Sequence, residues 1–387
     1  MDRLNIAFYT DSYLPGTDGV VTSIVNFKKG LEKKGHRVYI FASSNMQGAR
    51  RIREKNVFFY QGIEFKPYPQ YSVALFPYNS MLKVKGLGID IVHSQTPFMM
   101  GFAGLISAKM LRLPLVGSFH TMIIGNKPIR DYYYPKNGGL RRIAERSMKG
   151  YISYFYGKCD VVISPSETVK SILAKYRVRN SVVVPNSVDM ERFNPMVRGG
   201  AVREELGIED GQKVVLSLGR MSREKKIEVL LKAAKEITKK RRDVVFVIGG
   251  TGPAEGYYRN LAEKLHLGNG VRFLGYVSKE KLPHVYAASD MFCMPSTFET
   301  QGIVLLEAMA LGKPAVGADY MAINDIIKDG KNGERFMHDN YLDCARKIGK
   351  VLNNCAAYRN GAIETARRFS IDRLTEQLIK AYKIALD

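Results

Sequence analysis

Short apolar segments alternate with amphipathic helical patterns along almost the whole of this 387-residue chain. The apolar segments have the length of buried strands, and those of the first half are Asn5–Tyr9, Arg37–Phe41, Ile89–His93, Pro114–Phe119 and Val161–Ser164. Helical patterns such as Val20–Lys34 and Phe98–Leu111 separate them. Strands that alternate with helices form parallel sheets with helices on both faces, so the alternation predicts an α/β fold.

The pattern restarts after a turn-rich linker, Pro185–Pro195. The predicted strands of the second series are Val214–Gly219, Val244–Ile248, Val271–Leu274 and Pro314–Val316. A chain of this length exceeds one typical domain, so we expect two α/β domains of similar size, joined near residue 190. The final helix, Ile371–Leu386, could pack on either domain. Open parallel sheets bind ligands at the carboxyl ends of their strands, which predicts a site in a cleft between the two domains.

Cysteine spacing and hydropathy indicate the cellular compartment. The four cysteines lie far apart without C-x-x-C spacing, which argues against a zinc site or a disulfide scaffold and suits a reducing environment. The first nine residues are typical of a short buried strand rather than a signal peptide, and no apolar run is long enough to cross a bilayer. We therefore expect a cytoplasmic protein.

The chain is strongly basic, with a net charge of +22. Residues 1–195 carry 28 Lys and Arg against 13 Asp and Glu, a net +15, whereas residues 196–387 carry 31 against 24, a net +7. Such a field favours anionic partners, which include nucleic acid, anionic lipid and phosphorylated substrates. A solvated basic surface is the alternative that charge alone leaves open.

Two carboxylates, Glu299 and Glu307, stand on either side of Gly302. If a helix begins near Gly302, its free N–H groups and its dipole attract an anion. Glu307 is embedded in the apolar run Ile303–Leu311, where a carboxylate is costly without a partner. The segment predicts a phosphate cradle between two acceptors for hydroxyl groups, as a sugar nucleotide would need. Surface charge for the pair, and a helix cap or a buried ion pair for Glu307, are the alternatives.

Three further loops that follow predicted strands carry candidate ligand contacts. Arg220 directly follows a strand and Lys225 comes five residues later, a spacing that suits a diphosphate. Gly16 and Gly19 let backbone approach a ligand, and the helix after them would open its N–H groups toward it. His120 ends another strand and could bond to a sugar hydroxyl. A solvated basic loop, an ordinary turn and a structural histidine are the respective alternatives for these three loops.

Several motifs are missing or incomplete. The run Gly249–Pro253 lacks the last glycine of G-x-G-x-x-G and contains Pro253, so we interpret it as a turn and expect no NAD. The chain contains no Asp-x-Asp, so we expect no metal-bridged diphosphate and no metal site. It also contains no G-x-S-x-G and no Walker A sequence.

Taken together, these residues resemble the retaining glycosyltransferases of family 4, which have the GT-B fold. The shared segments are Pro15–Val20, Ser118–Thr121, Cys159–Ser166, Pro185–Phe193, Gly219–Lys226, Tyr286–Ser296 and Phe298–Ala308. The resemblance implies two Rossmann-like, doubly wound domains facing across a cleft. Residues 1–190 would bind the acceptor, with the helix 371–387 packed back on them, and residues 191–370 would bind the nucleotide-sugar donor.

The resemblance also implies roles for single residues. The implied catalytic residues are His120, Arg220, Lys225 and Glu299. The implied donor-binding residues are Gly16, Arg220, Lys225, Val277, Glu299, Gln301, Gly302, Ile303, Val304 and Glu307. Arg220 and Lys225 would neutralise the donor diphosphate, which Gly16 would approach. Glu299 would contact the sugar, Glu307 would hold the ribose hydroxyls, and Val277 would lie near the base. His120 would face the transferred sugar, and the residues from Gln301 to Val304 would offer backbone N–H groups.

One segment departs from the family pattern. The family often has Gly-Gly-x-Pro-Glu where this chain has Tyr320–Asp325, which leaves the donor's sugar and base open. The family's reaction moves a sugar from a nucleoside diphosphate to a hydroxyl with retention of configuration. It needs no cofactor and no enzyme nucleophile, because the acceptor attacks on the same face as the leaving phosphate, which accepts the acceptor's proton.

The acceptor is suggested by residues 131–158, where the aromatic run Tyr132-Tyr133-Tyr134 precedes a two-faced helix. Its apolar side comprises Leu140, Ile143, Ala144, Met148, Tyr151, Ile152 and Phe155. Its basic residues are Arg141, Arg142, Arg146 and Lys149. Basic amphipathic helices with aromatic residues can lie in a membrane interface, although a core helix with a solvated face fits the pattern too. The charge of the first half favours a lipid acceptor and peripheral attachment to an anionic cytoplasmic membrane face.

Three other functions compete with this reading. Transfer to a soluble sugar or phosphosugar uses the same donor site, and a sugar-nucleotide epimerase would need no acceptor. A nucleic-acid-binding protein would suit the charge, but the chain has no recognisable binding motif and no dense basic tail. We therefore expect no nucleic-acid partner.

Overall fold

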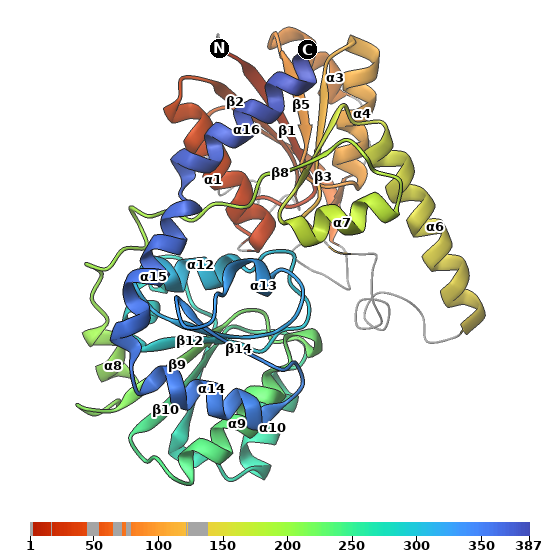
Figure 1. Cartoon of the computed structure of the whole chain (residues 1–387). Helices are drawn as coiled ribbons and strands as arrows, with labels where there is room; N and C mark the ends of the chain where they lie inside the picture. The colour runs from red at the N-terminus through yellow and green to blue at the C-terminus, as the bar shows by residue number, and fades with distance from the viewer. Residues whose placement is uncertain are drawn as a thin grey trace. The chain divides into compact units, whose positions relative to one another are not determined.

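The structure, a computed structural model, describes residues 3–16, 18–44, 54–64, 72–74, 79–120, 122 and 138–387. The chain forms two compact units (Figure 1). Unit 1 comprises Met1–Ser187 and Ile371–Asp387, and unit 2 comprises Val188–Ser370. The chain therefore passes from one unit to the next three residues before the predicted boundary at residue 190.

Unit 1 is built on a mainly parallel sheet. Its strands are β1 (Asn5–Thr10), β2 (Arg37–Ser44), β3 (Val57–Glu64), β4 (Ser72–Ala74), β5 (Ile91–Ser94), β6 (Leu115–Ser118), β7 (Val161–Ser164) and β8 (Ser181–Val183). Among the described residues the order is β4-β3-β2-β1-β5-β6-β7-β8, and only β3 and β4 pair antiparallel. The five strands predicted in the first half correspond to β1, β2, β5, β6 and β7. Because β1 pairs with both β2 and β5, the strand order reverses at β1.

The helices of unit 1 begin where local chemistry favours them. They are α1 (Gly19–Lys33), α3 (Ser80–Gly86), α4 (Met99–Leu111), α6 (Gly138–Gly157), α7 (Glu167–Lys175) and α16 (Ile371–Leu386). The Asp18 carboxylate accepts the Val21 N–H at 2.9 Å and caps α1, and Ser166 caps α7 through Val169. Such caps satisfy N–H groups that lack a partner in the first turn.

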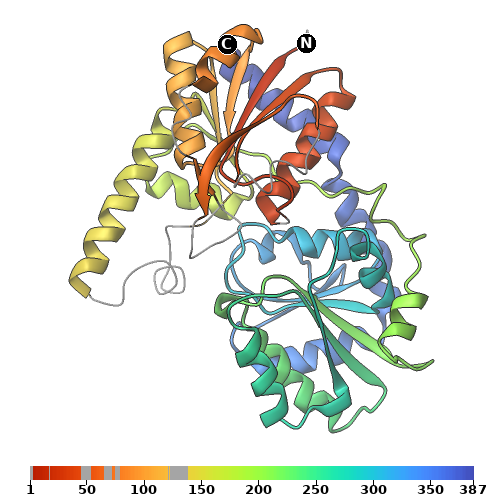
Figure 2. The same ribbon diagram turned by 180° about the vertical axis from the view of Figure 1, so that it is seen from behind.

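The C-terminal helix α16 belongs to unit 1, as the family resemblance implies. The Tyr382 hydroxyl lies 2.8 Å from His93 Nδ1, and the Lys34 ammonium lies 2.8 Å from the Glu376 carboxylate. A Cβ atom on Gly30 would lie 1.9 Å from Thr375 Oγ1, so α1 and α16 approach each other closely (Figures 1 and 2). Glycine at this position allows the contact.

Unit 2 contains a parallel sheet with the Rossmann strand order. Its strands are β9 (Lys213–Leu218), β10 (Val244–Gly249), β11 (Val271–Gly275), β12 (Met291–Met294), β13 (Ala315–Ala318) and β14 (Gly333–Phe336). The order is β11-β10-β9-β12-β13-β14, which reverses between β9 and β12. The predicted strands of the second half correspond to β9, β10, β11 and β13. The prediction omitted β12 and β14, each of which has only four residues.

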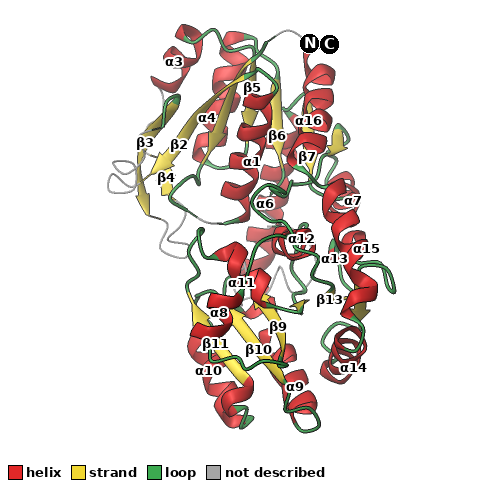
Figure 3. Ribbon diagram, turned by 90° about the vertical axis from the view of Figure 1, so that its left-hand side faces the viewer, coloured by secondary structure: helices red, strands yellow, loops and turns green. Residues whose placement is uncertain are grey.

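Helices lie on both sides of this sheet (Figure 3). They are α8 (Gly200–Glu205), η2 (Arg223–Lys225), α9 (Ile227–Thr238), α10 (Glu255–Lys264), η3 (Gly268–Gly270), α11 (Leu282–Ala288), α12 (Ile303–Ala310), α13 (Ile323–Ile326), α14 (Tyr341–Leu352) and α15 (Cys355–Arg368). Because both faces of the sheet are covered, its strands are almost uniformly apolar, and Phe246 and Phe292 are fully buried. The core lies between the sheet and these helices.

A buried carboxylate holds the C-terminal part of unit 2 together. The Glu334 side chain is 1% exposed and lies 2.7 Å from Lys347 Nζ and 2.6 Å from Lys350 Nζ. The Tyr358 hydroxyl donates to it at 3.1 Å. Burial alone would raise the pKa of Glu334, but the bonds from Lys347, Lys350 and Tyr358 outweigh it and lower the pKa to about 2.

We therefore predict that Glu334 stabilises unit 2 above pH 4.5, its ordinary pKa, and that this contribution is lost as the pH falls toward 2. Glu334→Gln should lower the free energy of unfolding at pH 7 by about 2 kcal/mol, because Lys347 keeps a buried charge without its counter-ion. Urea unfolding at pH 7 and at pH 3 measures both effects. An equal loss at the two pH values would contradict the assignment.

Candidate functional site

The loops after β9 and β12 leave the sheet of unit 2 where its strand order reverses, the place where such sheets bind ligands. Arg220 and Lys225 lie in the first loop, and Glu299 lies in the second. Lys225 Nζ lies 2.6 Å from Glu299 Oε1, and the two side chains are 27% and 12% exposed. The structure thus brings together a cation and a carboxylate that stand 74 residues apart in the sequence.

Glu224 fixes the cationic loop, a role that the sequence analysis missed. Its side chain is 5% exposed, and its Oε1 atom lies 3.3 Å from the Arg220 guanidinium and accepts a bond from the Ser222 hydroxyl. The Glu224 carbonyl accepts the Thr297 N–H at 3.4 Å, which ties the β9 loop to the β12 loop. The available signal in the sequence was an acidic residue between the two cations Arg220 and Lys225. The structure shows that this acid is buried, where a carboxylate needs partners.

The glycine run after β10 supports the backbone at Arg220. Gly250 has a positive φ of 119°, and a Cβ atom there would lie 1.9 Å from the Gly219 carbonyl oxygen. The Gly219 N–H donates to the Gly249 carbonyl at 3.1 Å, and the Met221 N–H donates to the Thr251 carbonyl at 2.9 Å. The segment is a turn, as predicted, and its second function is to hold the β9 loop in place. Only glycine fits at Gly250.

Val277 lies beside the end of β10. A Cβ atom on Gly249 would lie 3.3 Å from Val277 Cγ2, and Val277 is half-buried against the core of unit 2. The neighbouring Tyr276 is exposed. Val277 therefore sits on the same carboxyl edge of the sheet as Arg220.

Helix α12 begins at Ile303, which confirms the predicted start near Gly302. Gly302 is the N-cap in a left-handed conformation, φ 89°, and glycine has no side chain with which to cap the first turn. The first N–H groups of a helix have no intrahelical acceptor, and its dipole favours an anion there. Gln301 and Gly302 are buried, whereas Ile303 and Val304 are partly exposed.

Glu307 has a protein partner that the sequence analysis did not identify. The Tyr286 hydroxyl donates to Glu307 Oε2 at 2.7 Å, and both residues are buried. Burial raises the pKa of Glu307 to about 7, while the Tyr286 bond and the charge of Arg192 act in the opposite direction. One carboxylate oxygen of Glu307 is therefore hydrogen-bonded without a ligand. The partner is a tyrosine hydroxyl, so Glu307 is neither the helix cap nor the member of a buried ion pair that the sequence left as alternatives. Tyr286 begins a segment already singled out, Tyr286–Ser296, but nothing in the sequence pairs it with Glu307.

In unit 1, Gly16 lies in a tight turn. Its N–H donates to the Tyr13 carbonyl at 3.0 Å, and a Cβ atom on Gly16 would lie 3.0 Å from that same oxygen. The expectation that α1 opens its first N–H groups toward a ligand is wrong for Val21, because the Asp18 carboxylate accepts that N–H. An aspartate at the N-cap satisfies the helix end from within the chain.

His120 follows β6 and meets the loop that follows β5. Its Nε2 atom lies 3.0 Å from Gln95 Oε1, an acceptor, so Nε2 carries the proton. Burial lowers the pKa of His120 to about 4, which keeps the imidazole neutral at pH 7. Nearby on the sheet edge, Asp11 follows β1 and accepts bonds from Thr96 Oγ1 and the Met100 N–H. Thr121, beside His120, lies outside the described residues.

Helix α6 does not have one uniform apolar face. Its C-terminal half is buried through Ile152, Phe155 and Tyr156. In its N-terminal half Leu140 is 60% exposed and Ile143 is 66% exposed. The core-helix interpretation therefore holds for one half only, while Tyr132–Tyr134 lie outside the described residues. In the part of the chain that the structure describes, no helix has the length and apolar character to span a membrane.

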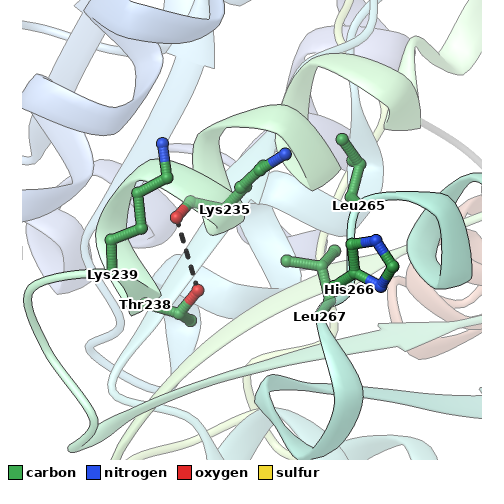
Figure 4. Close-up of a pocket in the computed structure, with 6 residues that line it drawn as sticks. All are labelled: Lys235, Thr238, Lys239, Leu265, His266 and Leu267. Carbon is green, nitrogen blue, oxygen red and sulfur yellow. Dashed lines mark hydrogen bonds between the residues drawn. The ribbon is translucent and has the colours of Figure 1, made fainter.

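A pocket elsewhere in unit 2 is not part of this site (Figure 4). It is lined by Lys235, Thr238, Lys239, Leu265, His266 and Leu267. These residues lie at the C-terminal end of α9 and just after α10. A helix that follows a parallel strand runs back toward the amino end of the sheet, which is opposite to the ligand-binding edge.

Comparisons with known proteins identify the class. The chain matches the family described as "Glycosyl transferases group 1" over residues 200–369 and "Glycosyltransferase Family 4" over residues 17–192. It is 31% identical to an alpha-monoglucosyldiacylglycerol synthase of Streptococcus pneumoniae, over 88% of this chain and 76% of that protein. It is 30% identical to a D-inositol 3-phosphate glycosyltransferase of Nocardia farcinica, over 77% and 67%.

The fold has solved counterparts. The crystal structure of Anabaena Alr3699/HepE in complex with UDP and glucose matches with a TM-score of 0.74 and 19% identity, over 98% of this chain and all of that one. Two Rossmann-like parallel-sheet units are those of the GT-B fold. The protein is a glycosyltransferase. It belongs to glycosyltransferase family 4.

We predict that Gly250→Ala will disturb the Arg220 loop, because the new Cβ atom would overlap the Gly219 carbonyl. The expected loss in free energy of unfolding is about 3 kcal/mol, from overpacking and the positive φ. Thermal unfolding with and without UDP, GDP or ADP measures stability and nucleotide binding together.

Gly256→Ala is the matched control, because a Cβ atom on this exposed glycine of α10 meets nothing within 4 Å. It should leave both quantities close to those of the wild type. Wild-type nucleotide binding by Gly250→Ala would show that the glycine turn does not support the site.

Proposed function

We propose that this protein is a retaining glycosyltransferase that moves a hexose from a nucleoside-diphosphate sugar to a hydroxyl group of a membrane lipid or lipid-linked glycan. The observation that carries the proposal is the contact of Lys225 with Glu299 at 2.6 Å, at the reversal of strand order in unit 2. In this contact the cation that would bind phosphate lies directly beside the carboxylate that would accept bonds from sugar hydroxyls. The chain's membership of family 4 supports the same reading.

The donor diphosphate would bind between the β9 loop and the start of α12. Arg220 and Lys225 would neutralise its charge, and the backbone N–H groups from Gln301 to Val304 would bond to its oxygens. Glu224 holds the Arg220 guanidinium, so that cation needs little reorganisation when the ligand arrives. Lys225 would exchange part of its contact with Glu299 for the phosphate, which leaves Glu299 available to the sugar.

Glu307 would hold the ribose through Oε1, since its Oε2 atom accepts the Tyr286 hydroxyl. Val277, on the same sheet edge, would lie against the base. In unit 1, Gly16 would approach the diphosphate through its backbone. The neutral His120, whose Nε2 proton is directed to Gln95, would face the transferred sugar.

Sugar transfer passes through an oxocarbenium-like transition state as the diphosphate leaves. Negative charge then develops on the leaving phosphate, where Arg220 and Lys225 would stabilise it most strongly. In the proposed same-face mechanism the leaving phosphate accepts the proton of the acceptor hydroxyl. The two cations would take the part that a metal ion has in other transferases, and no cofactor would be needed.

The lipid acceptor is supported by two features. One relative, an alpha-monoglucosyldiacylglycerol synthase, is named for a lipid product. In unit 1 the exposed Leu140 and Ile143 of α6 are accompanied by the exposed Arg142, Arg146 and Lys149. Apolar side chains among basic ones suit the interface of an anionic membrane. We therefore propose a cytoplasmic protein that attaches peripherally to the membrane.

A soluble phosphosugar is the second candidate acceptor. The relative named D-inositol 3-phosphate glycosyltransferase supports it, and a basic unit 1 would attract such an anion as well. The two acceptors are distinguished by experiment below.

We predict that Lys225→Ala will lower kcat/KM for the donor sugar by at least ~100-fold, because it removes a cation from the leaving group. The protein should stay folded, since Lys225 is partly exposed. A hydrolysis and thermal-shift screen with UDP-, GDP- and ADP-sugars identifies the donor, and turnover is then measured with it. Lys239→Ala, on the opposite side of the unit, is the control. Unchanged turnover in Lys225→Ala would refute the assignment.

We predict that the protein floats with liposomes of anionic lipid at low salt and that the double variant L140S/I143S floats several-fold less. Loss of two exposed apolar side chains removes burial in the interface without touching the core. Leu342→Ser, at a 56% exposed leucine of unit 2, is the control. A parallel screen offers diacylglycerol in the liposomes and inositol phosphate in solution. Transfer to inositol phosphate alone, with no flotation, would establish the second candidate.

A further inference from the structure

Tyr286 is locked in one position behind Glu307. It is fully buried, and its ring makes an edge contact with Phe193 at 5.9 Å and a tilted contact with Phe292 at 5.9 Å. Its hydroxyl therefore has a fixed direction, toward Glu307 Oε2 at 2.7 Å. The bond joins α11 to α12 and holds the carboxylate in one orientation. The other oxygen, Oε1, is left for a ligand.

Arg192 adds a positive charge to this pair from the linker segment. Its guanidinium donates to the Lys279 carbonyl and lies 4.8 Å from the centre of the Phe193 ring. Burial raises the pKa of both Glu307 and Tyr286, and the charge of Arg192 acts against this rise. Lys279 stands two residues after Val277, so Arg192 also anchors the loop assigned to the base.

We propose that Tyr286 and Arg192 are positioning residues that hold Glu307 oriented and ionised for the donor ribose, which makes nucleotide binding depend on pH near neutrality. This inference rests on the proposed function, because it uses the assignment of Glu307 to the ribose. It adds to that function two positioning residues, Tyr286 and Arg192, and a dependence of nucleotide binding on pH.

A ribose binds more strongly to the ionised form of Glu307 than to the protonated form. Its two hydroxyl groups donate hydrogen bonds, and an ionised carboxylate accepts them more strongly than a protonated one. Burial raises the pKa of Glu307 to about 7, with Tyr286 and Arg192 holding it down. The ionised form prevails above that pKa, so nucleotide affinity falls as the pH drops below 7.

Other groups on the elements that pack against α12 have different surroundings. His284 is bonded to the Arg198 carbonyl, and Lys313 donates to the carbonyls of Ala287 and Ser289. Cys293 contacts Cys344. Arg359 lies beside Gly312, past the end of the helix. Beyond burial, the pKa of Glu307 responds to Tyr286 and Arg192.

The test is Tyr286→Phe, which removes the hydroxyl and keeps the ring. Calorimetric titration with UDP, GDP and ADP from pH 5.5 to 8.5 identifies the tightest nucleotide and gives its Kd at each pH. If the variant raises the pKa of Glu307 by about one unit, the ratio of variant to wild-type Kd rises from near 1 at pH 8.5 to roughly 5 at pH 7. The probe's own phosphate titrates identically with each protein, so the ratio reports protein groups.

Tyr358→Phe is the matched control, because it also removes a buried tyrosine–glutamate bond in unit 2, but at Glu334, to which no ligand is assigned. Its Kd ratio should stay flat across the pH range. Arg192→Gln is the second variant, which removes a charge that lowers the same pKa and should move the ratio in the same direction as Tyr286→Phe. It keeps the test decisive if Tyr286→Phe does not fold.

A 2′,3′-dideoxy form of the same nucleotide completes the design. Without ribose hydroxyls it should bind more weakly and show the same Kd ratio at every pH. A flat ratio for both Tyr286→Phe and Arg192→Gln with the normal nucleotide would overturn the inference while the donor site stands. Failure of the wild-type protein to bind any of the three nucleotides would instead overturn the proposed function.

Discussion

The reversal of strand order between β9 and β12 is the constraint on which the site depends. The connections after these two strands leave in opposite directions, so the carboxyl edge of the sheet is open between them. The β9 loop supplies Arg220 and Lys225, the β12 loop supplies Glu299, and the contact at 2.6 Å closes the space between the loops. The glycine turn after β10 matters because it holds the β9 loop against this edge. The proposed donor site therefore depends on the topology and on the charged side chains of these two loops.

Buried carboxylates in unit 2 show how the same group serves stability and function. Glu334 has two lysines and a tyrosine, so its pKa falls to about 2 and it is ionised at neutral pH. Glu307 has a tyrosine and only the field of a more distant arginine, so burial dominates and its pKa rises to about 7. A carboxylate that is fully paired holds a fold together, whereas one with an open oxygen can bind a ligand. This difference in pairing is the reason for proposing Glu307, and not Glu334, as the ligand of the ribose.

Unit 1 also gathers polar side chains at one edge of its sheet. Its strand order also reverses, and the loops after β1, β5 and β6 bring Asp11, Gln95 and His120 to the same sheet edge. Helix α6 is divided between a buried half that contributes to the core and an exposed half that combines leucine and isoleucine with arginines. Family membership makes the protein a glycosyltransferase, and this exposed half is what favours a lipid among the acceptors.

The amino-acid sequence by itself determined the α/β alternation, the change of unit near residue 190 and the start of α12, because these depend on local periodicity and on glycine conformation. It also identified Glu299, Glu307, Arg220 and Lys225 as candidates. Only the tertiary structure paired Lys225 with Glu299, Tyr286 with Glu307 and Tyr382 of α16 with His93, whereas the family resemblance already implied that α16 packs on unit 1. The separation in sequence is 74 positions for Lys225 and Glu299, 21 positions for Tyr286 and Glu307, and 289 positions for His93 and Tyr382. Such contacts are set by strand order and helix packing, which no local pattern in the sequence encodes.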